Sequence, residues 1–542
     1  MPRWVKHKNR KKMKNKITYI LVIALISITS CSKDFTERTS LTSVTVDNSY
    51  NTADEVRATT STLYSGLPWA GFMSRGLDDI GDVMSGNSHS YEGNGDYSAF
   101  VNFSQSAATP LVSYCWTAFY KVGGWAASYL QAFELKKTVG GDATILDPGI
   151  AECHFVLGIT YFYIVRTFGD APIIDDPGKV ALEGNFNIPR YVKEDVLRYA
   201  IEQMKLAEAG LPDSDVPGRA TKYSAKAYLA KMYLYAKDYT NAAAKALEVI
   251  NSAKYQLVPT ENYAKMFNSS SMNNNIESIF SIQYQLTGNP WGAGCQLMAD
   301  RGPNNLNTSE ANMWELFRPS IDLMQSWEPG DKRRPATVME HGWTMPSWKP
   351  QNADAGYNAF MANGYVYDTI QSTDHGGEKN GTRSNIAKYV VGPGSKYGGE
   401  PVLGMNTGQN FMMMRYADVL LIYAEAILGE NGSTSDANAL NAYNSVRNRA
   451  GLASKSTITK DDIMHERRME FAFEGDYWFD IQRQGYAKAK SIIEKQNRGQ
   501  YENPVYVTFT EDHMYLPVPA NESLQDPALL ELAKDPVRYY SK

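Results

Sequence analysis

The stretch that most constrains the fold is 466–483, which reads ERRMEFAFEGDYWFDIQR. Charged residues and large apolar residues, most of them aromatic, are interleaved along it. On a helix, Arg467, Glu470 and Glu474 share one face, and the aromatic side chains fall on other faces. A helix that is apolar on several faces is buried, and buried charges must be paired because unpaired ones are very costly. The stretch therefore predicts an interior helix held by an Arg–Glu network, with Gly475 at a bend or a close backbone approach.

We interpret these charges as structural rather than catalytic. Carboxylates near arginines could serve in acid–base chemistry, but pairing with arginine holds a carboxylate ionised, and a general acid must carry a proton. The residues that we expect to form this structural signature are Glu466, Arg467, Arg468, Glu470, Glu474, Trp478 and Asp480.

The run ERRMEFAFEGDYWFDIQRQG resembles the ERR-x-E-[LF]-AFEG-x-RWFDL-x-R-x-G signature of the SusD/RagB family. Members of that family are outer-membrane lipoproteins of Bacteroidetes that bind glycans, or in some cases peptides, and feed a TonB-dependent transporter. Segments 151–173, 414–452 and 515–529 are similar to other family segments, so the resemblance spans most of 31–530. Tyr477 stands where the family often has Arg, which removes one expected ion pair, and His154 also stands where Arg is usual.

Helical periodicity dominates much of the chain. In 222–250, a helix of small and apolar residues, a tight turn and a second amphipathic helix resemble a tetratricopeptide repeat. Segments 51–67, 111–137 and 194–210 also predict helices, and 276–286 alternates like a strand. We expect a mainly α protein of irregular tetratricopeptide-like repeats in a right-handed stack, with a loop-rich ligand-binding face and few short strands.

The first thirty residues have the pattern of a lipoprotein signal peptide. They hold eight Lys and Arg and no acidic residue, and an apolar run from Ile17 to Ile28 is too short to span a bilayer. Cys31 follows directly, as in a lipobox, so cleavage before it would leave an acylated N-terminus. The resemblance implies the same anchor, although Ile28 stands where Leu is commoner. We expect Cys31 to be lipidated and the chain to lie in the outer membrane, facing the cell exterior.

The charge balance excludes some partners. Without the signal peptide, 46 basic residues face 59 acidic ones, a net charge of −13, which makes nucleic acid a poor partner. The four cysteines show no zinc spacing, and the three beyond Cys31 are expected to be small buried residues, with one disulfide left open. We expect no cofactor and no metal site; the Gly392-Pro393-Gly394 turn lacks the residues of a phosphate-binding loop.

Two regions rich in glycine and aromatic residues, 71–103 and 287–408, are typical of ligand-binding loops. Aromatic faces stack on sugar rings, and amides and carboxylates bond sugar hydroxyls. The family signature lies in the helical frame and does not fix binding residues, so these are chosen on chemistry alone. The candidate ligand-binding residues are Tyr91, Asn94, Asp96, Tyr97, Asn289, Trp291, Trp343 and Trp348.

The sequence therefore divides into five parts: 1–30 signal peptide, 31–50 lipidated tether, 51–286 N-terminal helical part, 287–408 Gly/Trp-rich loops and 409–542 C-terminal helical part. The favoured function is capture of an oligosaccharide or polysaccharide and its delivery to a SusC-like TonB-dependent transporter. A peptide ligand, or a transporter lid without its own glycan site, remains an alternative. An enzyme is disfavoured because no hydrolase motif is present, although a carboxylate pair cannot be read from one sequence.

Overall fold

The computed structural model describes residues 49–67, 75–90, 95–184, 186–286, 294–349, 364–367, 381–530 and 538–540. The predicted signal peptide and nearly all of the predicted tether, Cys31 included, lie outside these ranges.

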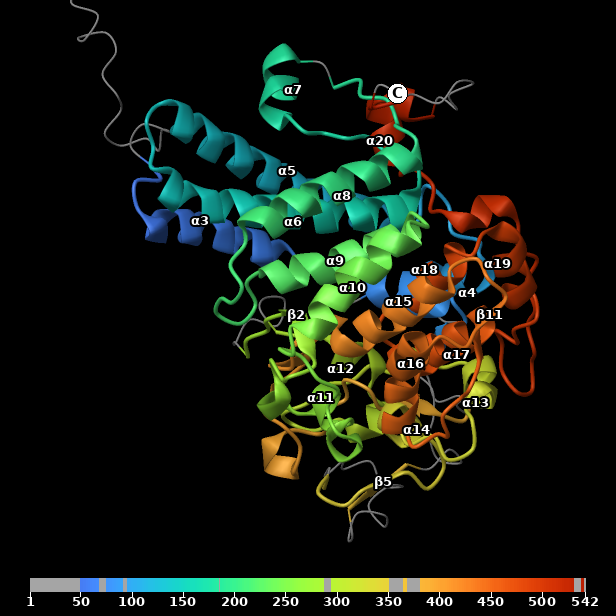
Figure 1. The fold of residues 1–542 in the computed structure, drawn as a ribbon. Coiled ribbons are helices and arrows are strands. Elements are labelled where there is room, and N and C mark those ends of the chain that lie inside the picture. The colour runs from blue at the N-terminus through green and yellow to red at the C-terminus, as the bar shows by residue number, and fades with distance from the viewer. Residues whose placement is uncertain are drawn as a thin grey trace, which may run out of the picture.

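Helices make up most of the described chain (Figure 1). The α-helices are α3 (Ala53–Gly66), α4 (Gly95–Asn102), α5 (Pro110–Thr138), α6 (Ala143–Phe168), α7 (Pro177–Glu183), α8 (Lys193–Gly210), α9 (Lys222–Tyr235), α10 (Tyr239–Asn251), α11 (Lys265–Asn268), α12 (Leu297–Arg301), α13 (Ile321–Ser326), α14 (Arg334–Thr337), α15 (Tyr416–Leu428), α16 (Ala437–Arg449), α17 (Lys460–Phe471), α18 (Tyr477–Gln482), α19 (Tyr486–Ile493) and α20 (Ala520–Gln525). A π-helix, η1 (Leu77–Val83), and short 3₁₀ turns complete the set.

Strands are short and occur in pairs. Within the described residues they form six two-stranded antiparallel sheets. The strands are β1 (Ser88–Ser90), β2 (Ser278–Ile282), β3 (Phe317–Pro319), β4 (Val338–Met339), β5 (Thr344–Met345), β6 (Tyr365–Val366), β7 (Asn385–Ile386), β8 (Val402–Leu403), β9 (Asn406–Thr407), β10 (Phe411–Arg415), β11 (Ser433–Thr434) and β12 (Ile458–Thr459). The expectation of a mainly α protein with few short strands is confirmed, and the strand expected within 276–286 is β2.

The helices pack largely in chain order. Helix α5 packs on α6, α6 on α8, α8 on α9 and α9 on α10; α10 then packs on α15, and α15 on α16 (Figure 1). This ladder joins the N-terminal and C-terminal helical parts into one stack. Neighbouring helix pairs are what a repeat protein requires, and the assignment to irregular tetratricopeptide-like repeats stays a prediction.

Helix α6 is the centre of the N-terminal part. Asp142 caps it, accepting a hydrogen bond from the Thr144 amide at 2.9 Å, and Gly169 ends it at φ 70°. Among the described helices it alone is long and apolar enough to cross a membrane, but 83% of its apolar window is buried in the protein. Its hydropathy is therefore that of a core helix.

The predicted helix across 466–483 is two helices in the structure. Helix α17 ends at Phe471, and α18 begins at Tyr477. Between them Phe473 and Gly475 adopt left-handed conformations, with φ of 63° and 79°. The buried carboxylate of Asp82 accepts hydrogen bonds from both of their amides, at 2.9 and 3.1 Å. The predicted continuous helix was wrong because these backbone groups bond to η1 instead, while the bend at Gly475 is confirmed.

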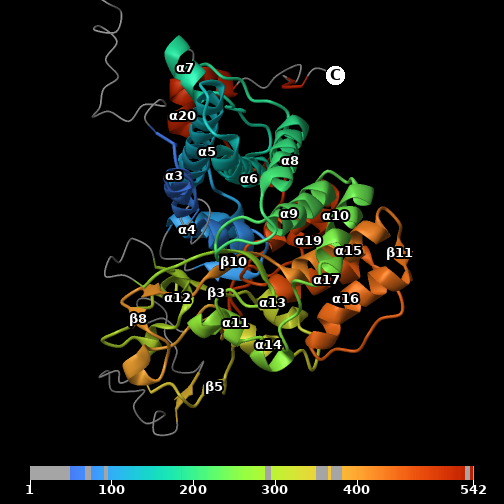
Figure 2. The same ribbon diagram turned by 60° about the vertical axis from the view of Figure 1, so that its left-hand side comes forward.

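The loop region 294–349 and 381–408 lies below the helical stack and has a small core of its own (Figure 2). That core is separate from the main one, and Trp348 and Tyr365 are among its buried members. We call it the lower core.

Candidate functional site

A buried ion network centres on Arg415, at the end of β10. Its guanidinium bonds to Glu277 at 2.7 Å, to both oxygens of Glu474 at 2.8 Å, and to Glu470. Arg449, from the end of α16, bonds to Glu277 and Glu470 as well. Burial raises the pKa of Glu470, but Arg449, Arg415 and Arg333 outweigh it and hold that pKa well below its usual range. The structure thus pairs these buried charges in an Arg–Glu network, as the sequence predicted, and the Glu470 carboxyl is ionised.

The partners of the other signature residues come from distant segments. Arg467 does not pair with Glu470; it donates to Asp480 and Asp418, each at 2.7 Å. Arg468 donates to Asn87 at 2.8 Å. The remaining members are Glu466, which lies 2.7 Å from Arg333, and Trp478, which is 1% exposed and meets Phe103 at a tilt and Phe509 edge-on.

The network reaches into the loop region at two points. Arg333, just before α14, donates to Glu470 at 2.9 Å. Lys388, just after β7, donates to Glu474 at 2.7 Å and to the carbonyls of Glu470 and Ala472. Burial lowers the pKa of Lys388 to about 8, although Glu474 opposes it. Arg333 lies shortly before β4 and Lys388 just after β7, and β4 and β7 pair with each other. These two contacts therefore fix the β4–β7 sheet, from which the chain continues into the loop before β5.

Trp343, directly before β5, packs its indole ring against two other aromatic rings. Its ring centroid lies 5.7 Å from that of Trp348 and 6.4 Å from that of Tyr365. The indole Nε1 donates to the Pro335 carbonyl at 2.8 Å, and the backbone carbonyl accepts from Tyr367 at 2.8 Å. Trp343 is half-buried, whereas Trp348 is 4% exposed and Tyr365 fully buried. We call Trp343, Trp348 and Tyr365 the Trp343 platform.

The platform carries a polar edge that the sequence did not suggest. The Trp343 amide donates to the Glu340 carbonyl at 2.8 Å, and the Glu340 carboxylate forms a two-point pair with Arg334, both bonds 2.7 Å long. Both side chains are about a third or more exposed. An aromatic face beside an exposed Arg–Glu pair offers stacking together with donors and acceptors for hydroxyl groups. Neither residue belongs to a recognisable motif, so only their contacts reveal them.

The structure describes the side chain of none of the other six candidate ligand residues. Tyr91, Asn94, Asn289 and Trp291 lie outside the described residues. Asp96 and Tyr97 lie in the first turn of α4, and their side chains are not described. Their roles stay predictions. Of the eight candidates, the structure brings together Trp343 and Trp348, and it buries Trp348 so that this ring supports its neighbour rather than presenting a face of its own.

The cysteines that the structure describes are isolated from one another, and the histidine singled out by the sequence has an ordinary polar partner. Cys115, Cys153 and Cys295 are buried free thiols, as expected, and burial raises the pKa of each. His154 bonds to Gln203 at 2.7 Å and serves as a packed polar residue. Across the described ranges, no group of three or more His, Cys, Asp and Glu side chains could hold a metal ion.

Two family models match the chain. The model described as the SusD family matches residues 248–531, and a second, described as starch-binding and associating with the outer membrane, matches residues 74–234. Together they cover both helical parts and the loops between them.

Individual relatives match over nearly the whole length. A SusD-like protein of Bacteroides ovatus is 30% identical, over 96% of this chain and 98% of its own. SusD-like protein P2 of Formosa agariphila is 28% identical over 87% and 90%. A crystal structure described with a xylogluco-oligosaccharide superposes with a TM-score of 0.75 at 28% identity, covering 90% of this chain and 99% of the other. A laminarin-binding SusD-like protein shares the fold with a TM-score of 0.68 at 24% identity, covering 88% and 98%.

Proposed function

Because this chain belongs to the SusD family, we propose that it captures oligosaccharides at the cell surface and delivers them to a SusC-like TonB-dependent transporter. Proteins of this family bind carbohydrate and are not catalytic. One relative of solved structure is described with a xylogluco-oligosaccharide. The ligand of the present chain is accordingly proposed to be a glycan.

The observation that carries the proposal is the Trp343 platform. A half-buried indole whose nitrogen is already bonded to Pro335 cannot turn away, so its face is held ready for a sugar ring. The rings of Trp348 and Tyr365 lie behind it, and the ion network fixes the segment from Arg333 onward. Preorganisation of this kind reduces the entropy lost on binding. The exposed Arg334–Glu340 pair supplies hydrogen-bonding groups from the same segment, whose backbone carbonyls at Pro335 and Glu340 bond to Trp343.

Delivery and anchoring form the second part of the proposal. The charged leader, the short apolar run and Cys31 support a lipid anchor on the outer membrane. We expect a Cys31→Ala variant to lose acylation by labelled fatty acid in cells and to leave the membrane fraction. Retention of label by that variant would contradict the assignment of Cys31. Co-purification of a SusC-like transporter with this protein from outer membranes would test the proposed partnership.

Affinity electrophoresis tests the glycan site. The chain from Ser32 onward is run through gels that contain plant, host or microbial polysaccharides, together with Trp343→Ala and the matched variant Trp314→Ala, which removes another half-buried loop tryptophan. Stacking of one ring contributes roughly 1–2 kcal/mol by analogy with bases on aromatic side chains, so Trp343→Ala should bind about 5- to 30-fold more weakly. Trp314→Ala should be retarded like the parent.

Three results would count against the proposal. Equal retardation of parent and folded Trp343→Ala would remove the Trp343 platform from the site. Retardation by no polymer would favour a peptide ligand or a transporter lid. Shortening of a polymer would indicate an enzyme.

A further inference from the structure

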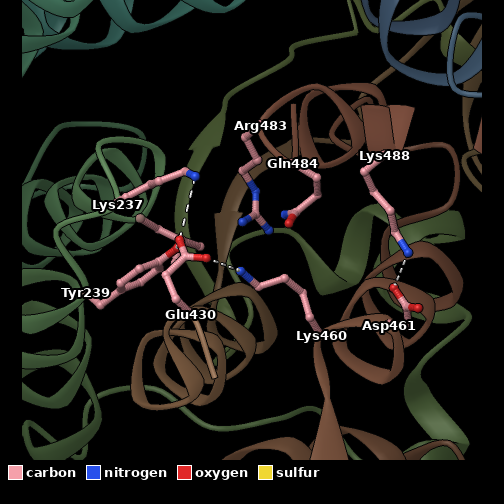
Figure 3. A pocket seen from close by; sticks show the side chains of 9 residues that line it. Lys237, Tyr239, Glu430, Lys460, Asp461, Arg483, Gln484 and Lys488 are labelled. Carbon is pink, nitrogen blue, oxygen red and sulfur yellow. Dashed lines mark hydrogen bonds and ion pairs between the residues drawn. The ribbon is translucent and has the colours of Figure 1, made fainter. Parts of the chain in front are cut away.

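A concavity lies on the helical frame, where the two helical parts meet (Figure 3). It encloses about 330 Å³, which is in the range of small-ligand sites. It is formed by the α9–α10 turn, the end of α15, the start of α17 and the α18–α19 region. Its lining residues are Leu234, Lys237, Tyr239, Glu430, Lys460, Asp461, Arg483, Gln484 and Lys488. We call it the lysine pocket.

Three lysines from three different segments line this pocket: Lys237 and Lys460 point toward Glu430, and Lys488 points toward Asp461 (Figure 3). Lys237 and Lys460 lie 3.6 and 3.9 Å from the Glu430 carboxylate, and Lys488 lies 2.6 Å from that of Asp461. The Tyr239 hydroxyl donates to Glu430 at 2.5 Å, and this bond and Lys460 lower the pKa of the Glu430 carboxyl. The pocket thus has three ammonium groups against two carboxylates.

The ion pairs of this pocket lie at the surface, and the Lys237 side chain is as exposed as that of Glu430. The side chains of Glu430 and Asp461 are 64% and 72% exposed. Ion pairs at such exposed positions contribute little to stability, so an incoming anion can replace the carboxylates as the partner of the lysines at small cost. The carboxylates then remain as acceptors for hydroxyl groups.

The back of the pocket is rigid. Arg483 is buried, and its guanidinium donates to Glu425 at 2.5 and 2.7 Å and to Asp480 at 3.0 and 3.1 Å. Its charge is therefore balanced, and it serves as a fixed wall. Lys237 adopts a left-handed conformation, with φ of 58°, at the cap that ends α9. Its amide donates to the Leu234 carbonyl at 3.1 Å, and the Asp238 amide donates to the Tyr233 carbonyl at 2.9 Å, so the backbone at this side of the pocket is fixed.

We propose that the lysine pocket binds a sugar that carries a carboxylate or a sulfate group. The anionic group would lie among Lys237, Lys460 and Lys488, and the sugar hydroxyls would donate to Glu430 and Asp461 and accept from Gln484. The choice of a sugar as the carrier rests on the proposed capture of oligosaccharides. The pocket is built from other segments than the Trp343 platform, so it is a separate site.

Calorimetric titration at low salt tests this inference. The ligands are a tri-galacturonide, its methyl ester of the same length, and inorganic sulfate. The proteins are the chain from Ser32 onward, Lys460→Gln/Lys488→Gln, and two controls: Lys205→Gln, which removes an exposed lysine elsewhere, and Trp343→Ala. Thermal unfolding establishes that each variant is folded.

We expect the charged trisaccharide to bind at least tenfold more tightly than its ester and than sulfate. The affinity for the tri-galacturonide should fall at least tenfold in the double variant and stay unchanged in both controls. It should also decrease with added salt, because salt screens the charges of the lysines.

Each contrary result overturns the inference. No binding of the tri-galacturonide, equal binding of its ester, or unchanged affinity in the double variant would remove the lysine pocket as its site. Sulfate binding as tightly as the trisaccharide would leave a simple anion site without sugar recognition. The proposed capture of glycans is tested separately. If a neutral polymer retards the parent protein and Trp343→Ala abolishes this retardation, glycan capture stands even when the lysine pocket binds no ligand.

Discussion

Gly81 and Gly475 meet backbone to backbone: a Cβ built on Gly81 would lie 2.3 Å from the Cα of Gly475. This contact joins η1 to the turn between α17 and α18. It allows the Asp82 carboxylate to reach the amides of Phe473 and Gly475. The two glycines are 394 residues apart in the chain, so the contact ties its beginning to its end.

The first prediction concerns this contact. A methyl group at Gly81 has no room, because the nearest atoms are backbone, and overpacking of a core typically costs about 1–3 kcal/mol. Gly81→Ala should therefore lower the urea midpoint. The matched control is Gly124→Ala in α5, where a Cβ would meet nothing within 4 Å and helix propensity favours Ala by about 1 kcal/mol. Equal midpoints for the two variants would show that the turn can move apart.

The second prediction concerns the centre of the ion network. Arg415→Met would leave the carboxylates of Glu277, Glu470 and Glu474 buried with fewer partners. Breaking a buried pair by removing one partner costs about 3–5 kcal/mol. Chemical denaturation should show a loss of that size, whereas Lys205→Met, which breaks an exposed pair with Glu202, should change the free energy of unfolding by less than about 0.5 kcal/mol. A small loss of unfolding free energy in Arg415→Met would mean that the carboxylates become protonated or hydrated.

The third prediction concerns pH. Burial raises the pKa of Asp82 to about 7, with Arg301 opposing and Asp78 adding to the rise. An unfolded aspartate titrates near 3.9, so between about pH 4 and 7 the folded chain holds a proton that the unfolded chain has lost. The contribution of Asp82 to stability is complete below pH 4 and is lost as the pH rises through 7.

Asp82→Asn should remove this slope, because an amide does not titrate in that range and can still accept from Phe473. The measurement is the unfolding midpoint at steps from pH 4 to 8 for both proteins. Parallel curves would show that Asp82 is ionised in the folded chain throughout.

The fourth prediction separates the two rings of the Trp343 platform. Trp348 is buried in the lower core, and Trp-to-Ala changes in cores cost about 3–5 kcal/mol. Trp348→Ala should therefore lower thermal stability strongly. Trp343→Ala should keep most of the stability and lose glycan affinity instead. Calorimetric melting alongside affinity electrophoresis measures both effects, and a stable Trp348→Ala variant with unchanged binding would contradict the supporting role of that ring.

The sequence predicted those features that local spacing encodes. Helices α3, α5, α8, α9 and α10 begin and end within a few residues of the segments that periodicity indicated. The need to pair the charges in 466–483 predicted the ion network, because desolvation leaves no alternative. Local spacing could not reveal the break after Phe471, since the groups that cause it lie in η1, about 390 residues away.

The candidate sites divide in the same way. Trp343 stood out because a tryptophan in a Gly-rich loop is unusual. Arg334 and Glu340 did not, since their role depends on the fold that places them beside that ring. The lysine pocket takes residues from 234–239, 430, 460–461 and 483–488, so no motif of contiguous residues could have indicated it.

The ion network also determines the order in which the chain can fold. Helices α5 to α10 contact their neighbours in sequence, and such local contacts form quickly. The network instead draws on Glu277, Arg333, Arg415 and Glu470, so it is complete only when all of them have been synthesised. A chain that emerges from N to C terminus can therefore assemble its first helices early. Its charged centre can be completed only after residue 474 has been synthesised, so the burial of these charges is coupled to nearly the whole length of the chain.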